Sequence, residues 1–161
     1  MRPMTATLLS TLLVAALSGC EKYDLDRQME ALCKADGGVK VYEVVTLPVD
    51  RFDSTGRLIT GPAQDMGGGL YVKKVTEGLR IEWRTDAIKA GEPFGKALIS
   101  EGRLLRFSTR VVRTVDNKVL GEEISYGRSG GEISIGHPSQ NFCPRPRPAP
   151  DVVQAVILKG Q

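Results

Sequence analysis

Histidine and aromatic residues are scarce in this sequence, and their scarcity excludes several kinds of site. Only 6% of the residues are aromatic, and His137 is the single histidine. One imidazole cannot form a histidine-rich metal site, and no carboxylate or cysteine cluster stands at ligand spacing around it. The nearby serines, Ser129, Ser134 and Ser139, lack the Gly-x-Ser-x-Gly elbow of a hydrolase. We expect His137 to be structural or exposed, and we expect no metal, no cofactor and no catalytic residue.

The sequence also lacks an apolar run long enough to cross a bilayer. The uncharged run over residues 3–19, which follows Arg2, is shorter than the roughly 20 apolar residues that a spanning helix needs. A basic end followed by such a run is typical of a secretory signal peptide. The run ends in Leu17-Ser18-Gly19-Cys20, which resembles the lipobox of bacterial lipoproteins.

The lipobox resemblance implies that residues 1–19 are removed and that the Cys20 thiol takes a diacylglycerol. The new amino group would also be acylated, with a chain such as palmitate, and two or three acyl chains hold a protein stably on a membrane. Glu21, being other than Asp, favours the outer membrane. We expect a lipid-anchored protein of the cell envelope that faces the periplasm. The alternative is that Cys20 is an ordinary cysteine near a conventional cleavage site.

A strong excess of charge of either sign is missing as well. The chain has 22 Lys and Arg against 19 Asp and Glu, and loss of Arg2 with the signal segment leaves 21 against 19. Nucleic-acid binding needs concentrated basic surface. The balance therefore gives no reason to expect a nucleic-acid partner, and we expect none.

Only three cysteines occur in the chain. If Cys20 carries lipid, Cys33 and Cys143 remain in a compartment where thiols are oxidised, and we expect them to form a disulfide. The alternative is two free buried thiols.

A short helix is predicted directly after the lipidation site. Leu25, Met29, Leu32 and Cys33 recur at the spacing of one helix face. Asp24 can cap the start of this helix, and the glycines at 37–38 can end it.

Glycine is abundant, at 18 residues, and the remaining pattern favours short strands and turns. In the segment 79–85, Leu79, Ile81 and Trp83 alternate with charged residues, which is typical of a strand with one buried face. Asp116 and Asn117 favour a hairpin turn. The expected strands are 39–47, 70–76, 79–85, 97–100, 105–115, 119–128, 132–135 and 152–158, with a long loop at 48–69 and an extended Pro-rich segment at 144–150.

These elements predict an α+β fold, mainly an antiparallel sheet with one short N-terminal helix, stapled by one disulfide. The expected organisation is a signal peptide at 1–19, a lipid-anchored linker at 20–23, a single α+β domain at 24–143 and a Pro-rich strap or tail at 144–161.

Four arginines suggest a binding surface. Arg80 and Arg84 share one face of an expected strand, and Arg106 and Arg110 share one face of another. If the strands are neighbours, the four guanidinium groups could bind lipid phosphate, a peptidoglycan carboxylate or the acidic loop of a partner protein. The alternative is that Glu82, Glu122 and neighbouring carboxylates neutralise them in solvated cross-strand pairs.

Other chemical motifs are weak. Glu122 and Glu123 are adjacent and so point to opposite sides of a strand, which argues against a locally formed glycosidase pair. The glycine-rich segments 67–69 and 127–131 lack the Lys-Ser/Thr ending of a phosphate-binding loop, so we interpret them as turns.

The segment 33–43, Cys-Lys-Ala-Asp-Gly-Gly-Val-Lys-Val-Tyr-Glu, resembles a group of small uncharacterised proteobacterial lipoproteins, also met in mobile or phage-like regions. The segments 121–131 and 142–144 fit the same resemblance. It implies a shared fold and disulfide, with no activity to carry over.

Three functional hypotheses follow. The leading one is a non-enzymatic envelope lipoprotein that binds a protein or an envelope component such as peptidoglycan at the periplasmic face of the outer membrane. The second is a periplasmic enzyme inhibitor or a mobile-element or phage exclusion lipoprotein, which would act through a loop at 48–69 or 127–141. The third is a weak envelope hydrolase whose carboxylates meet only in the folded chain.

Overall fold

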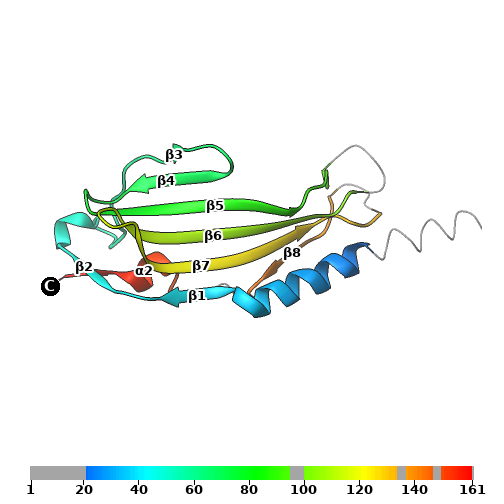
Figure 1. Ribbon diagram of the computed structural model, residues 1–161, viewed down its shortest axis with the longest axis horizontal. Coiled ribbons are helices and arrows are strands. Elements are labelled where there is room, and N and C mark those ends of the chain that lie inside the picture. The colour runs from blue at the N-terminus through cyan, green and yellow to red at the C-terminus, as the bar shows by residue number, and fades with distance from the viewer. Residues whose placement is uncertain (1–20, 95–99, 134–136, 147–149, 161) are drawn as a thin grey trace, which may run out of the picture.

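The computed structural model describes residues 21–94, 100–133, 137–146 and 150–160. Within them the chain forms a mainly antiparallel β-sheet with one N-terminal helix, α1 (residues 21–36), and a disulfide between Cys33 and Cys143. The predicted α+β fold class is therefore confirmed. Figure 1 shows the long strands running along the long axis of the molecule, with α1 beside one edge of the sheet.

Helix α1 forms because its apolar side chains share one face. Leu25, Met29 and Cys33 are buried, as the helical spacing predicts. The helix ends where the Gly37 N–H donates to the carbonyl oxygen of Cys33 at 2.8 Å and Gly38 takes a φ of 108°. Only glycine adopts such a φ readily, so the predicted end is correct.

The start of α1 differs from the prediction. Residues 21–23, which we expected to form a linker, belong to α1, so Asp24 lies inside the helix and does not cap its start. The Lys22 N–H donates to the carbonyl oxygen of Gly131 at 3.1 Å. This bond ties α1 to a distant loop, which the sequence pattern does not show.

The body of the sheet is an antiparallel meander. Its strands are β3 (Gln64–Asp65), β4 (Leu70–Lys74), β5 (Leu79–Lys89), β6 (Arg103–Arg113) and β7 (Lys118–Ser129). Each pairs with the next, which confirms the hairpin predicted at Asp116 and Asn117, between β6 and β7. Asn117 has a φ of 55° in the second turn, a conformation that asparagine tolerates well. The segment expected as a long loop at 48–69 also holds a 3-10 helix, η1 (Val49–Arg51).

Two short strands share the outer edge of β7. Strand β1 (Gly38–Val41) pairs antiparallel with residues 121–124, and β8 (Gln140–Cys143) pairs antiparallel with residues 126–129. We expected a strand at 132–135. Residues 132–133 are not part of any of the strands β1 to β9, and residues 134–135 lie outside the described part. Most of the strand expected at 97–100 also lies outside it, and Ser100 is not in a strand.

The single strand expected at 39–47 is wrong, because the chain breaks after β1. The second piece, β2 (Val45–Leu47), pairs in parallel with β9 (Ile157–Lys159) in a separate two-stranded sheet. The Tyr42 and Glu43 N–H groups both donate to the carbonyl oxygen of Leu120, at 2.8 and 2.9 Å. Leu120 lies where the pairing of β6 and β7 shifts register. This irregularity in β7 turns the neighbouring chain away.

The strand expected at 152–158 is also wrong. Residues Val152–Val156 form a short helix, α2, before β9 begins. The Asp151 carboxylate caps this helix by accepting from the Gln154 N–H at 2.9 Å. Val152 and Val156, one turn apart, are completely buried. The segment after Cys143 therefore contributes to the core, as a strap across the domain does.

Two hydrophobic clusters lie on opposite faces of the sheet. Paired residues of neighbouring strands point to the same side, and successive residues alternate. Leu104, Ile124 and Tyr126 lie under α1 on one side, which we call the helix face. Ile81 and Val111 lie under α2 on the other side, which we call the groove face.

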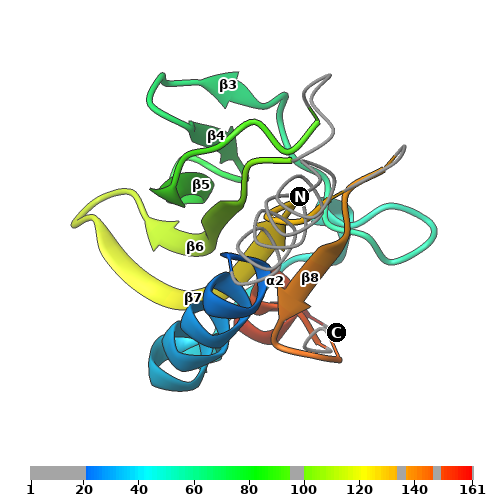
Figure 2. The ribbon, with the colours of Figure 1, turned by 90° about the vertical axis from the view of Figure 1, so that its right-hand side faces the viewer.

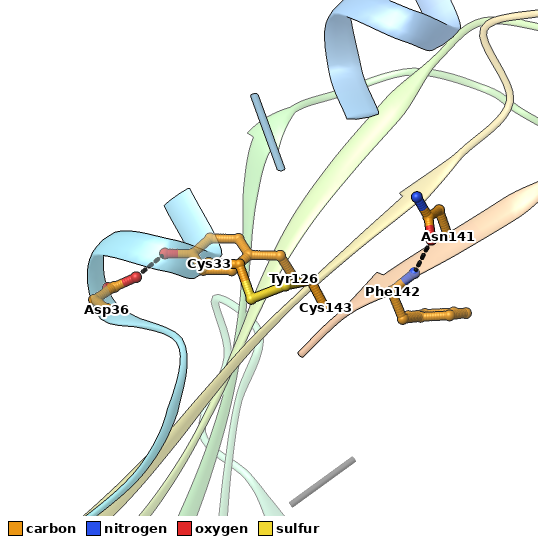
Figure 3. Close-up of a disulfide and its surroundings, with 6 residues drawn as sticks. All are labelled: Cys33, Asp36, Tyr126, Asn141, Phe142 and Cys143. Carbon is orange, nitrogen blue, oxygen red and sulfur yellow. Dashed lines mark hydrogen bonds between the residues drawn. A yellow bond between two sulfur atoms is a disulfide. The ribbon is translucent and has the colours of Figure 1, made fainter. Parts of the chain in front are cut away.

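The predicted disulfide is confirmed. The sulfur atoms of Cys33 and Cys143 are bonded at 2.02 Å, with a sequence separation of 110. Figure 3 shows the bridge between the end of α1 and the end of β8, beside Tyr126. The Tyr126 hydroxyl donates to the Asp36 carboxylate at 2.7 Å. The C-terminal end of α1 is thus fastened to the sheet by a covalent bond and a hydrogen bond.

Candidate partner-binding groove

The groove face is covered only in part. At one end α2 packs on it, and at the other β8 continues into the Pro-rich segment (Figure 2). Between them lies a groove of about 340 Å³. It is lined by Trp83, Phe107, Thr109, Glu123, Ser125, Phe142, Cys143 and Pro144.

The register of the strands assembles the floor of this groove. Trp83 pairs with Thr109 and Thr109 with Glu123, and in the next row Phe107 pairs with Ser125. Alternation had predicted that Trp83 lies on the buried face of its strand. It did not predict that the floor is half aromatic and half hydroxyl-bearing, because that depends on which strands are neighbours.

A glycine lets a third aromatic ring close the end of the groove. Gly127 pairs with Phe142, and a Cβ at this glycine would lie 2.9 Å from Cε1 of Phe142 and 3.1 Å from Cε2 of Phe107. Any side chain at Gly127 would therefore displace both rings. Phe142 keeps about half of its surface exposed, so it is available to a ligand.

One carboxylate stands at the α2 end of the groove. The Glu123 carboxylate accepts a hydrogen bond from the Val152 N–H at 3.2 Å. Asp151, the cap of α2, also lines this end, next to Trp83 and Thr109. The groove thus offers aromatic surface to apolar groups, and hydroxyl and carboxylate oxygens to hydrogen-bond donors.

The four arginines predicted as a patch lie on the opposite side, the helix face. The register brings β5 and β6 together, so Arg80, Arg84, Arg106 and Arg110 share that face. Each lies within 4 Å of a carboxylate. The pairs are Arg80–Glu82 at 2.7 Å, Arg84–Asp86 at 2.8 Å, Arg110–Glu122 at 3.3 Å, and Arg106 with Asp36 at 3.6 Å and Asp86 at 3.9 Å. The charges of the four arginines are therefore neutralised by carboxylates, both within one strand and across strands, as the alternative interpretation expected.

The best-buried charged residue was not singled out from the sequence. The Arg128 guanidinium donates to both carboxylate oxygens of Asp26 in α1, at 2.9 and 3.1 Å, and to the carbonyl oxygen of Ser139 at 2.9 Å. Burial raises the pKa of Asp26, but the bonds from Arg128 and Asn141 outweigh it, so the pKa lies below its ordinary value. No signal in the sequence links Asp26 to Arg128, because they are 102 residues apart.

A second ion pair fastens the start of α1. The Lys22 ammonium lies 2.5 Å from the Glu132 carboxylate, which also accepts from the Ser139 N–H at 2.6 Å. Burial alone would raise the pKa of Glu132, but these bonds lower it to about 2. Glu21 extends the network by pairing with Lys89. Residues 21 and 22 of α1 are therefore held by charged side chains from the end of β5 and from the loop after β7.

Two other residues considered in the sequence remain. Cys20 lies outside the described residues, and His137 is exposed in the loop before β8. Among the residues described, no three His, Cys, Asp or Glu side chains form a group that could hold a metal ion. Likewise, no helix in the described part is long and apolar enough to cross a membrane.

Comparisons with protein-family models, with curated proteins and with solved structures gave no match to this chain.

Proposed function

We propose that this chain is a bacterial envelope lipoprotein, anchored through an acylated Cys20, that binds a protein or another envelope component and catalyses no reaction. The site of binding in this proposal is the groove on the groove face.

The start of α1 carries the proposal. The described part of α1 runs from Glu21, and its backbone and side chains are bonded to the sheet within two residues: Lys22 to Gly131 and Glu132, and Glu21 to Lys89 and to the Gly102 N–H. A segment destined to be cut away or to act as a loose spacer has no need of such bonds. An anchor that must hold the domain in a fixed orientation does.

The composition of the groove supports binding over catalysis. Aromatic rings supply a large apolar contact area at low entropic cost, and the hydroxyl groups of Thr109 and Ser125 lie beside them. A peptide or a glycan strand of the envelope presents both apolar surface and hydrogen-bonding groups, so either chemistry fits.

The anchor is tested on the protein purified from membranes. We expect the mature chain to begin at Cys20 with the mass of the attached acyl chains, and the variant Cys20→Ser to be released in soluble form. A mature chain that begins at another residue and needs no detergent would refute the anchor.

The groove is tested by photo-crosslinking in intact cells. A photo-reactive amino acid at Phe142 or Ser125 lies in the groove, and one at the exposed Val115 in the β6–β7 turn is the matched control. We expect the two groove positions to capture the same partner and Val115 not to capture it. Capture of the same partner at all three positions, or at none, would contradict binding in the groove.

A second candidate function, inhibition of a wall-degrading enzyme, is favoured by one loop. The Asp53 carboxylate accepts from the Thr55 N–H at 2.8 Å, the Thr55 hydroxyl at 2.7 Å and the Arg57 N–H at 2.9 Å. The loop 53–57 is therefore pre-organised without burial, beside a pocket of about 590 Å³ that includes Phe52 and Leu158. Pre-organised loops lose little entropy on binding.

The inhibitor hypothesis predicts that the soluble domain lowers the activity of a lysozyme-type enzyme. Asp53→Ala removes all three loop bonds and would weaken this inhibition, whereas Asp24→Ala, an exposed control on α1, would not. Absence of inhibition at micromolar domain concentrations would remove this candidate.

A further inference from the structure

We propose that the end of the domain at which α1 begins rests on the lipid surface through three exposed apolar side chains, Tyr23, Phe94 and Ile133. We call this set the basal rim. The inference rests on the anchor proposed above, because it is Cys20 that would bring this end to the membrane. The exposed fractions of the three residues are 69%, 53% and 47%.

The three residues come from separate segments that meet at the start of α1. Tyr23 follows Lys22 in α1, and Ile133 follows Glu132, the partner of Lys22. Phe94 follows Pro93, whose Cβ would lie 2.8 Å from a Cβ at Gly130. Figure 1 shows α1 beginning at one end of the long axis, and the β6–β7 turn lies at the other end.

The place of Cys20 indicates what covers the rim. Consecutive Cα atoms are about 3.8 Å apart, so acyl chains on Cys20 enter the bilayer close to Glu21. Glu21 and Lys22 are both bonded to the sheet, which leaves no spacer that could hold the rim away from the lipid. Exposed Phe, Ile and Tyr side chains this close to the acyl chains partition into the membrane interface.

The charges around the rim favour an apolar contact over an electrostatic one. The described segments 21–23, 88–94, 101–103 and 130–133 carry three cations and four carboxylates. Two of the cations, Lys22 and Lys89, are already paired with Glu132 and Glu21. We therefore expect the contact to require neither anionic lipids nor low salt.

Contact at the rim would orient the whole domain. The long strands run away from this end, and the 12 residues of β7 span about 40 Å at about 3.3 Å per residue. The domain would stand upright, with the groove partway along the sheet and the loop 53–57 near the end farthest from the membrane.

The test uses the chain from Cys20 onward, which contains every described residue, coupled through the Cys20 thiol to a maleimide-bearing phospholipid in vesicles. The other two cysteines are in the disulfide, so coupling is specific. Because the lipid is attached chemically, the result does not depend on whether cells acylate Cys20. Failure of the rim and failure of the anchor are thus separate outcomes.

The readout is quenching of a single tryptophan by acyl-brominated lipids. In a Trp83→Phe background, Phe94→Trp and Ile133→Trp place the probe on the rim, and Val115→Trp is the control in the distant turn. We expect quenching of about two-fold at both rim positions, since interfacial side chains insert about 5–10 Å, and none at 115. Equal quenching at 94 and 115, or none at 94, would overturn the proposal.

Two further measurements address folding and mechanism. Hydrogen exchange on the coupled wild type needs no substitution, and we expect slower exchange over 88–94 and 130–133 with no change at 114–117. Anionic lipids or high salt should leave the quenching unchanged. Loss of quenching in neutral lipids or in salt would show an electrostatic contact and refute the apolar rim.

Discussion

Removing the carboxylate of Asp26 is predicted to destabilise the domain far more than removing a similar carboxylate nearby on the same helix. The Arg128 side chain is only 3% exposed, and both its Nε and Nη2 donate to Asp26. Its other donors reach the carbonyl oxygens of Gly130 and Ser139 and the Ser139 hydroxyl. Among the described residues, Arg128 donates to no carboxylate other than that of Asp26. Asp26→Ala therefore leaves a buried guanidinium without a counterion.

The expected loss in the free energy of unfolding follows from the burial of this ion pair. Breaking a buried ion pair by removing one partner costs 3–5 kcal/mol. The Asp26 side chain is 20% exposed, so water can partly replace it, and we expect the lower end, about 3 kcal/mol. For a domain of this size that corresponds to a fall in Tm of about 10 °C.

The effect depends on pH with a defined sign. The pKa of Asp26 in the folded protein lies below its ordinary value of 3.8. The stabilisation is therefore present above pH 3.8 and is lost as the pH falls through the folded-state pKa. The difference in the free energy of unfolding between wild type and Asp26→Ala should have its full value at pH 7 and should decrease below pH 3.8.

Urea and thermal unfolding of the oxidised protein measure both effects. Asp24→Ala is the matched control, because Asp24 pairs with Arg27 on the exposed side of α1, and exposed pairs contribute under about 1 kcal/mol. The double variant Asp26→Ala with Arg128→Met should recover stability, since it removes the unpaired charge. If Asp26→Ala were as mild as Asp24→Ala, the reasoning from burial would be wrong.

Two other predictions concern the same end of the fold. Replacing Cys33 and Cys143 by serine should lower the free energy of unfolding by on the order of 4 kcal/mol, because the bridge closes a loop of 110 residues; a urea midpoint within error of the wild type would contradict this. The pKa of Glu132 is about 2 in the folded protein, as burial is outweighed by Lys22 and Ser139, against an ordinary 4.5. Its stabilisation is therefore present above pH 4.5 and is lost as the pH falls toward 2, so unfolding curves of Glu132→Gln should show a smaller loss of stability over this window than those of the wild type. Parallel pH dependence of the two proteins would rule this out.

The elements that local signals specify were predicted correctly. The stripe of Leu25, Met29 and Cys33 specified α1, and Asn117 marked the turn between β6 and β7. These signals act within a few residues of each other, so a single sequence contains them. The disulfide followed from the count of cysteines and the expected compartment, without any knowledge of the fold.

The errors occurred where distant pairing decides the outcome. Valine-rich residues 152–156 favour a strand by composition, yet the cap at Asp151 and burial of Val152 and Val156 one turn apart make them a helix. Likewise, nothing within 39–47 shows that its two halves pair with different partners, because the break is caused by the register shift at Leu120 in β7. Packing overrides propensity in both places.

The sequence predicted only part of the groove. The alternation around Trp83 indicated an inward face, but the neighbouring ring of Phe142 comes from β8, a strand that was not predicted. The requirement for Gly127 follows from that ring together with the ring of Phe107. A binding floor made by four strands depends on their order and register, and only the folded chain contains both.

The bonds between α1 and the sheet bear on the orientation of the domain. Lys22, Asp26, Cys33 and Asp36 bond it to the sheet at intervals along its whole length, by ion pairs, a disulfide and a hydrogen bond. A helix that served only as a spacer would need none of these bonds, and apolar contacts alone would suffice to bury its stripe. Because the described part of α1 runs from Glu21, every one of them would transmit the position of the proposed Cys20 anchor to the sheet. This supports a protein whose partner is met at a fixed height and direction above the membrane, rather than one that searches on a flexible tether.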